Sequence, residues 1–145
     1  MSAIGDRLAE RIAPGVRARM SNPRFVTVAT IGALACAPLA KVRADDGTTY
    51  DIAYEWLVVE ALVRRRDRAE LMGLPGAQKV RRAQTLGERV HKGNYLSGPR
   101  VFGFTGVYRP FAKYANVIVD GRTGAEADAL VCAWEADQGV AGFVA

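Results

Sequence analysis

The sequence predicts a mainly α fold, with about six helices around one core and a possible short β-hairpin near residues 117–123. Apolar residues recur at helical spacing along most of the chain, Gly and Pro separate these segments, and one β-branched run precedes an Asp-Gly pair. Half of the residues are hydrophobic and 24% are charged, as in an ordinary globular protein. At 145 residues we expect a single domain with a helical core (1–72), a helix-turn-helix part (73–122), and a C-terminal helix and tail (123–145).

Three helices are expected before residue 73. Residues 2–13 place apolar side chains four apart and precede a Pro-Gly pair, which predicts a short amphipathic helix. A Ser-Asn-Pro sequence at 21–23 is typical of a helix start, and the nearly uncharged stretch that follows to residue 37 predicts a central, enclosed helix. Thr48 and Asp51 approximate a capping box for the longest helix, which should run through about residue 72 and be buried on most sides.

Two further helices are expected in the helix-turn-helix part. Residues 77–92 form a basic helix that should end at Gly93-Asn94. Pro110 removes a backbone hydrogen bond, so the next helix, which runs to about residue 115, should either start near Tyr108 or carry a kink. We expect Phe111 to face inward on this short helix.

A strand pair and a last helix complete the predicted elements. Asn116 suits a left-handed helix cap, residues 117–119 are β-branched, and Asp120-Gly121 is typical of a hairpin turn. Thr123 and Glu126 have the spacing of a capping box for a helix over roughly residues 124–138.

The two cysteines, Cys36 and Cys132, lie in apolar contexts and have no partners at metal-ligand spacing. They predict two buried free thiols and a cytoplasmic protein. The apolar stretch over residues 25–37 is too short to span a bilayer as a helix, so we expect no membrane association.

Positive charge is concentrated in one part of the chain. Residues 79–113 contain eight Lys or Arg and one acid, a net charge of +7, whereas the whole chain carries +5. Six aromatic residues lie between positions 95 and 114. A basic region beside acidic flanks is the pattern expected of a surface that contacts phosphates.

The order basic helix, turn, short helix, strand and turn resembles the winged helix-turn-helix family of DNA-binding domains, over roughly residues 71–122. The resemblance implies that the second helix enters the major groove of double-stranded DNA. Tyr108, Arg109 and Lys113 would then face base edges or nearby phosphates, and Arg122 would lie in the wing. Contacts to phosphates are expected from six further cations, Lys79, Arg81, Arg82, Arg89, Lys92 and Arg100.

The sequence gives no sign of an enzyme, a cofactor, a metal or a small-molecule substrate. Gly103 and Gly106 lack the Lys and the preceding strand of a phosphate-binding loop. His91 is the only histidine, has no readable nucleophile or carboxylate partner, and should face solvent.

Two functions therefore remain open. The first is a bacterial cytoplasmic DNA-binding protein of winged-helix type, either regulatory or part of a larger nucleic-acid-associated system. The alternative is a small helical adaptor that uses the basic and aromatic surface to join a protein complex. A homodimer fits both functions.

Overall fold

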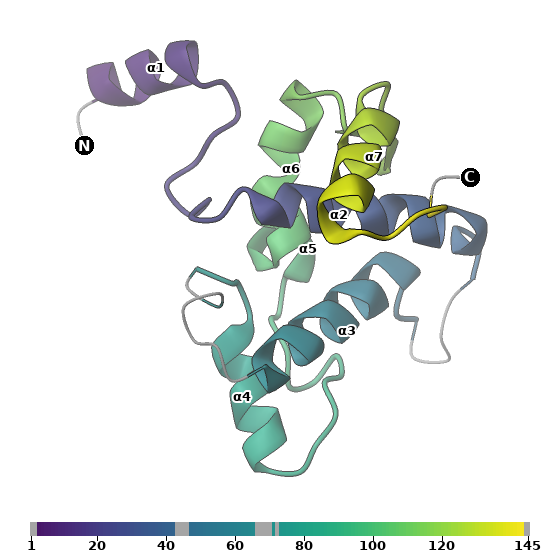
Figure 1. Cartoon of the computed structure of the whole chain (residues 1–145). Helices are drawn as coiled ribbons and strands as arrows, with labels where there is room; N and C mark the ends of the chain where they lie inside the picture. Colours follow the sequence, from purple (N-terminus) through teal and green to yellow (C-terminus); the bar gives the residue numbers. More distant parts are fainter. Residues whose placement is uncertain (1–2, 43–46, 66–70, 72, 144–145) are drawn as a thin grey trace.

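A computed structural model describes residues 3–42, 47–65, 71 and 73–143 (Figure 1). The mainly α fold and its short hairpin are confirmed. In chain order the described elements are α1 (Ala3–Ile12), α2 (Arg24–Cys36), the 3-10 turn η1 (Ala37–Leu39), α3 (Tyr50–Arg64), α4 (Ala77–Thr85), α5 (Pro99–Phe102), α6 (Phe104–Tyr114), β1 (Ile118–Val119), β2 (Arg122–Thr123) and α7 (Ala127–Gln138).

Helix α2 is central, as its lack of charge predicts. It packs against α3, α6, α7 and β2 (Figure 1). Phe25, which is fully buried, lies 6.1 Å from the Phe104 ring and 5.7 Å from the Tyr108 ring, measured between ring centroids. The backbone N–H of Asn22 donates to the Tyr108 hydroxyl at 2.9 Å, which ties the segment before α2 to α6.

Helices α3 and α4 are shorter than expected. Arg65 has extended backbone, so α3 ends at Arg64; residues 66–70 and 72, where the predicted helix would continue, lie outside the described residues. The N-cap of α3 is Thr49, whose side chain makes no capping hydrogen bond, so the predicted capping box is wrong. Helix α4 ends at Thr85 because Gly87 takes a left-handed φ of 71°.

Helix α6 begins at Phe104, one turn earlier than predicted, and contains Pro110 in its interior. The missing N–H of Pro110 leaves the Gly106 carbonyl without its usual helical donor. A single-turn helix, α5, packs directly against α6 and precedes it with only Gly103 between them. Of the two alternatives expected for the proline, the late helix start is wrong, because the first turn of α6 is anchored by a hydrogen bond from the Thr105 N–H to Glu55.

The hairpin predicted near 117–123 is present. Strands β1 and β2 pair antiparallel, with Ile118 opposite Thr123 and Val119 opposite Arg122. Its turn residues, Asp120 and Gly121, both have positive φ, as a two-residue turn of the primed type requires. The predicted left-handed cap is confirmed at Asn116, where φ is 54°. The predicted capping box at Thr123 is wrong, because Thr123 belongs to β2 and α7 starts only at Ala127.

The two ends of the chain differ in how they pack. Figure 1 shows α1 projecting from the rest of the molecule, and Leu8 and Ile12 on it are 56% and 75% exposed. After α7, by contrast, Phe143 folds back so that its ring meets Trp134 at 5.7 Å. Helix α7 itself carries Cys132, which is exposed, so only one of the two predicted buried thiols is confirmed.

Candidate nucleic-acid interface

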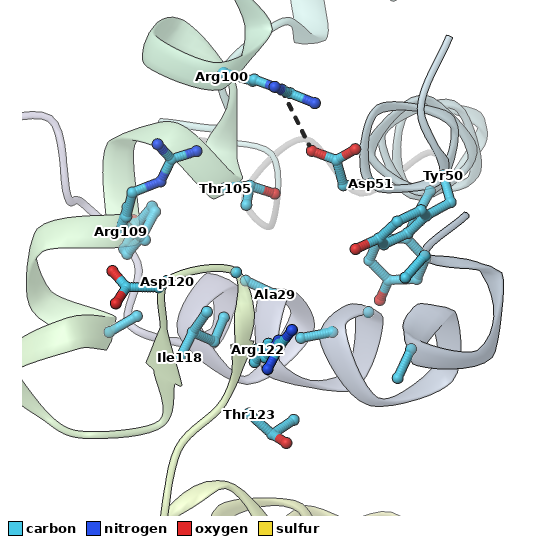
Figure 2. Close-up of a pocket in the computed structure, with 18 of the residues that line it drawn as sticks. Ala29, Tyr50, Asp51, Arg100, Thr105, Arg109, Ile118, Asp120, Arg122 and Thr123 are labelled. Carbon is cyan, nitrogen blue, oxygen red and sulfur yellow. Dashed lines mark ion pairs between the residues drawn. The ribbon is translucent and has the colours of Figure 1, made fainter. Parts of the chain in front are cut away.

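A hollow of about 830 Å³ lies between α2, the start of α3, α6 and the hairpin (Figure 2). We call it the basic groove. Its lining includes small residues of α2 and η1, three tyrosines, two acids and four cations. These are Ala29, Gly32, Ala33 and Ala37; Tyr50, Tyr54 and Tyr108; Asp51 and Asp120; and Arg100, Arg109, Lys113 and Arg122.

The four cations come from three elements. Arg100 lies on α5, Arg109 and Lys113 lie one turn apart on α6, and Arg122 is in β2. All four side chains are exposed, while the helix residues between them, Tyr108 and Ala112, are buried. With two acids on the same lining, the groove has a net charge of +2.

Two of the cations are only loosely engaged by acids. Arg100 Nε lies 3.6 Å from the Asp51 carboxylate, and Lys113 Nζ lies 3.7 Å from that of Asp120. Ion pairs this long and this exposed contribute little to stability, so an incoming anion can replace them. Arg109 and Arg122 have no ion pair with any residue that the structure describes.

The tyrosines of the lining have different roles. The Tyr54 hydroxyl donates to the Val28 carbonyl at 2.8 Å, and burial raises the pKa of Tyr54 to about 12. Its ring fills the space that a side chain at Gly32 would need, so Tyr54 is a fixed wall. Tyr50 is half-buried at the start of α3, and its hydroxyl has no hydrogen-bond partner in the described part of the chain.

Glu55 of α3 holds the first turn of α6 in place from outside that helix. Only 2% of Glu55 is exposed, and its carboxylate accepts hydrogen bonds from the Tyr95 hydroxyl at 2.8 Å and the Thr105 backbone N–H at 3.3 Å. A carboxylate at a helix N-terminus satisfies free N–H groups and favours the helix dipole. Burial raises the pKa of Glu55, and the bonds from Tyr95 and Thr105 oppose this.

The same carboxylate explains a glycine. A Cβ at Gly103, the N-cap of α6, would overlap the Glu55 carboxylate. The pKa of Tyr95 is also raised, mainly by burial and to a smaller extent by the neighbouring Glu55, so the phenol remains a hydrogen-bond donor. Glu55, Tyr95 and Gly103 are positioning residues for α6.

A second buried carboxylate, Glu60, organises the α4 end of the molecule. It is 4% exposed and accepts a 2.7 Å hydrogen bond from the Val90 N–H, beyond the end of α4. Arg89 Nε lies 3.2 Å from it and Arg64 Nη2 lies 3.5 Å from it. One of the predicted phosphate contacts, Arg89, therefore already forms an ion pair with Glu60, although its own side chain is exposed.

Nine of the ten predicted site residues are cations that fall into two groups. The groove group is Arg100, Arg109, Lys113 and Arg122. The α4 group is Lys79, Arg81 and Arg82 on the exposed face of α4, with Arg89 and Lys92 on the loop after it. Figure 1 shows α4 at the end of the molecule away from α6, so the continuous basic stretch of sequence forms two separate surfaces.

The tenth residue, Tyr108, was assigned to the wrong face. It is 1% exposed, and its ring packs on Phe25. The helix starts at Phe104 rather than near Tyr108. Of the three residues expected to face DNA bases, only Arg109 and Lys113 lie on its exposed face. His91 is exposed, as predicted, and its Nδ1 accepts a hydrogen bond from the Gly93 N–H at 3.1 Å.

Sequence reasoning missed the two buried carboxylates of α3 and several residues that line the groove. Glu55 and Glu60 interrupt the apolar face of the longest predicted helix, and acids in such a place signal buried carboxylates with specific partners. Tyr50 and Asp51 begin the same helix; Asp51 was assigned to its capping box, and Tyr50 was given no role. The run of Ala and Gly in α2 marks the floor, which a helix of larger residues would fill.

Comparisons with protein-family models, with curated proteins and with solved structures return no match. Across the described ranges there is no cluster of three or more His, Cys, Asp or Glu placed to hold a metal ion. None of the helices in these ranges is long and apolar enough to cross a membrane.

Proposed function

We propose that the protein binds double-stranded DNA, with α6 and the β1–β2 hairpin as its contact elements. The observation that carries the proposal is the gathering of cations from α5, α6 and β2 around one groove, two of them unpaired within the described chain. Arg and Lys so placed neutralise backbone phosphates and release counterions.

The arrangement also supports the winged helix-turn-helix resemblance as part of this proposal. A helix with an exposed basic stripe is followed at once by a two-stranded hairpin, and Arg122 lines the same groove as Arg109 and Lys113. In that family the helix reads the major groove and the wing contacts the backbone or the minor groove. The α4 group would contact phosphates farther along the duplex, in a bacterial cytoplasmic protein.

The direct test is a fluorescence-anisotropy titration of a labelled 20-base-pair duplex at low salt. We expect Arg109→Glu with Arg122→Glu to weaken binding by roughly 100-fold, because two phosphate contacts become repulsive. The matched control is Arg81→Glu with Arg82→Glu on α4, for which we expect a loss of about tenfold or less. Wild-type protein that binds no duplex at low salt would overturn the proposal.

A second function, assembly into a protein complex or a homodimer, is supported by α1. Its exposed apolar residues, Leu8 and Ile12, lie one turn apart on a helix that projects from the molecule (Figure 1). Exposed apolar stripes of this kind commonly mark protein contacts. Light scattering with and without DNA separates the functions: association that Ile12→Glu abolishes, in a protein that ignores DNA, would favour the adaptor.

A further inference from the structure

The basic groove is concave, and a fully paired duplex cannot fill it. In a duplex the bases are stacked inside and only the sugar-phosphate backbone meets the protein surface, apart from base edges in the grooves. Phosphates can reach the exposed Arg109, Lys113 and Arg122, but the 830 Å³ hollow between them and α2 would stay filled with water. The shape therefore suits a ligand that carries both a phosphate and a flat group free to enter.

The lining matches the two halves of such a ligand. Toward α2 the lining includes Ala29 and Ala33, which are small and apolar, and the Tyr54 ring covers Gly32 beside them. Tyr50 lies at the edge of this surface, and its hydroxyl has no hydrogen-bond partner among the described residues. Aromatic rings beside a cationic track are how proteins hold unpaired bases, because every base has a face that can stack.

Polar groups lie where they would orient the ligand. Figure 2 places Arg109 and Arg122 on the α6 and hairpin sides and Asp51 on the α3 side, and Thr105 lies in the first turn of α6. The Tyr54 hydroxyl already donates to the Val28 carbonyl, so Tyr54 can contribute only apolar ring contacts to a ligand. Phosphate is favoured near the two unpaired arginines, and the base is favoured over the alanine surface beside Tyr50.

We propose that the basic groove holds one unpaired nucleotide, with its base over Ala29 and Ala33 beside Tyr50 and its phosphate between Arg109 and Arg122. This inference rests on the proposed function, since the same cations are used, and it names the substrate class of that site. The nucleotide can belong to a single strand, to an opened or overhanging part of a duplex, or to a free mononucleotide. The shared chemistry is a base joined to a phosphate.

The test uses the full chain and three probes: a labelled 12-nucleotide single strand, a blunt duplex of the same sequence, and AMP as competitor. We expect the single strand to bind about tenfold tighter than the duplex at equal salt. Ala33→Leu fills the hollow without changing charge, so it should weaken the single strand about tenfold and leave the duplex within about twofold. The matched control is Ala35→Leu, which is exposed on the same helix and does not line the groove.

AMP distinguishes the sources. AMP that stabilises the wild type against heat, but not Ala33→Leu, identifies a free nucleotide as a ligand; a strand that binds while AMP has no effect identifies nucleic acid. Circular dichroism checks that Ala33→Leu folds, and Ala37→Leu, on the exposed surface of η1, replaces it if it does not.

Equal affinity for single strand and duplex, together with no effect of either filling variant, would overturn the inference. In that case duplex binding that is still lost in the Arg109→Glu, Arg122→Glu protein would leave the proposed function standing. Absence of binding to all three probes would remove both.

Discussion

The groove group and the α4 group of cations come from one basic stretch of sequence but have different surroundings. Arg100, Arg109, Lys113 and Arg122 surround a hollow, whereas Lys79, Arg81 and Arg82 project from the exposed face of a nine-residue helix. Each end of the molecule is organised by its own buried carboxylate. Glu55 anchors the start of α6, and Glu60 anchors the loop after α4.

The difference shows that charge density along a sequence does not define a binding surface. Arg89 counts toward the basic stretch, yet it is paired with Glu60. Arg122 lies outside that stretch, yet it lines the groove. What separates the two groups is whether the backbone places cations around a concave space, and that depends on contacts between residues far apart in the chain.

The largest expected effect comes from a glycine at the groove end. Gly103→Ala should lower the free energy of unfolding by about 3 kcal/mol, because the new Cβ displaces the Glu55 carboxylate from its partners Tyr95 and Thr105. At the α4 end, Gly87→Ala should cost about 1 kcal/mol, since its φ is 71° but nothing crowds the site. Urea unfolding gives the free energy of unfolding of both variants. Equal losses of stability would contradict the role given to Glu55.

The next effect is on the salt dependence of DNA binding. Arg109→Ala should reduce the slope of log affinity against log salt by about 0.9, the value for one lost phosphate contact. Arg81→Ala should reduce it by less, because we place Arg109 at the centre of the contact and Arg81 at its periphery. Anisotropy titrations between about 50 and 200 mM salt give both slopes. A larger change for Arg81 would reverse the ranking of the two groups.

A smaller effect is expected on the pH dependence of stability. Because burial raises the pKa of Glu55 above its ordinary value of 4.5, the folded protein holds this proton more tightly than the unfolded chain. The stabilisation is complete below pH 4.5 and is lost as the pH rises through the folded pKa. Glu55→Gln cannot titrate, so wild type should lose stability relative to this variant as the pH rises from 4 to 8. A stability difference that is constant over this range would contradict the assignment.

The smallest effect is a gain of affinity. Asp120→Asn removes an acid from the groove and should strengthen DNA binding by about twofold to threefold. Stability should change by less than about 1 kcal/mol, because the pair with Lys113 is exposed and Asn tolerates a φ of 51°. Glu88→Gln, near the α4 end, should change the affinity for DNA by less than about twofold. Equal gains from both variants would mean that only net charge matters.

Local chemistry made part of the fold predictable. The hairpin follows from residues 117–121, since β-branched residues favour strands and Asp-Gly favours positive φ. The central place of α2 follows from its lack of charge after Arg24. Helix boundaries were less predictable at Pro110, because the contact that supports the early start of α6 comes from Glu55, 50 residues away from Thr105.

The candidate site was predictable in its charges and not in its shape. Five of the ten expected residues line one groove, namely four cations and the buried Tyr108. The burial of Tyr108 against Phe25 depends on where α6 begins and on how it crosses α2, which no local pattern encodes. The hollow exists because small residues of α2 face the start of α3, a meeting of segments that follows from tertiary packing.

Photochemical cross-linking tests most directly the claim that the groove, and not α4, holds the nucleic acid. A single strand carrying 5-iodouracil would be irradiated with the wild-type protein, and the attached peptide identified by mass spectrometry. The account predicts attachment at Tyr50, with attachment lost in Ala33→Leu and kept in Arg81→Glu with Arg82→Glu. Attachment confined to residues 77–92 would contradict it.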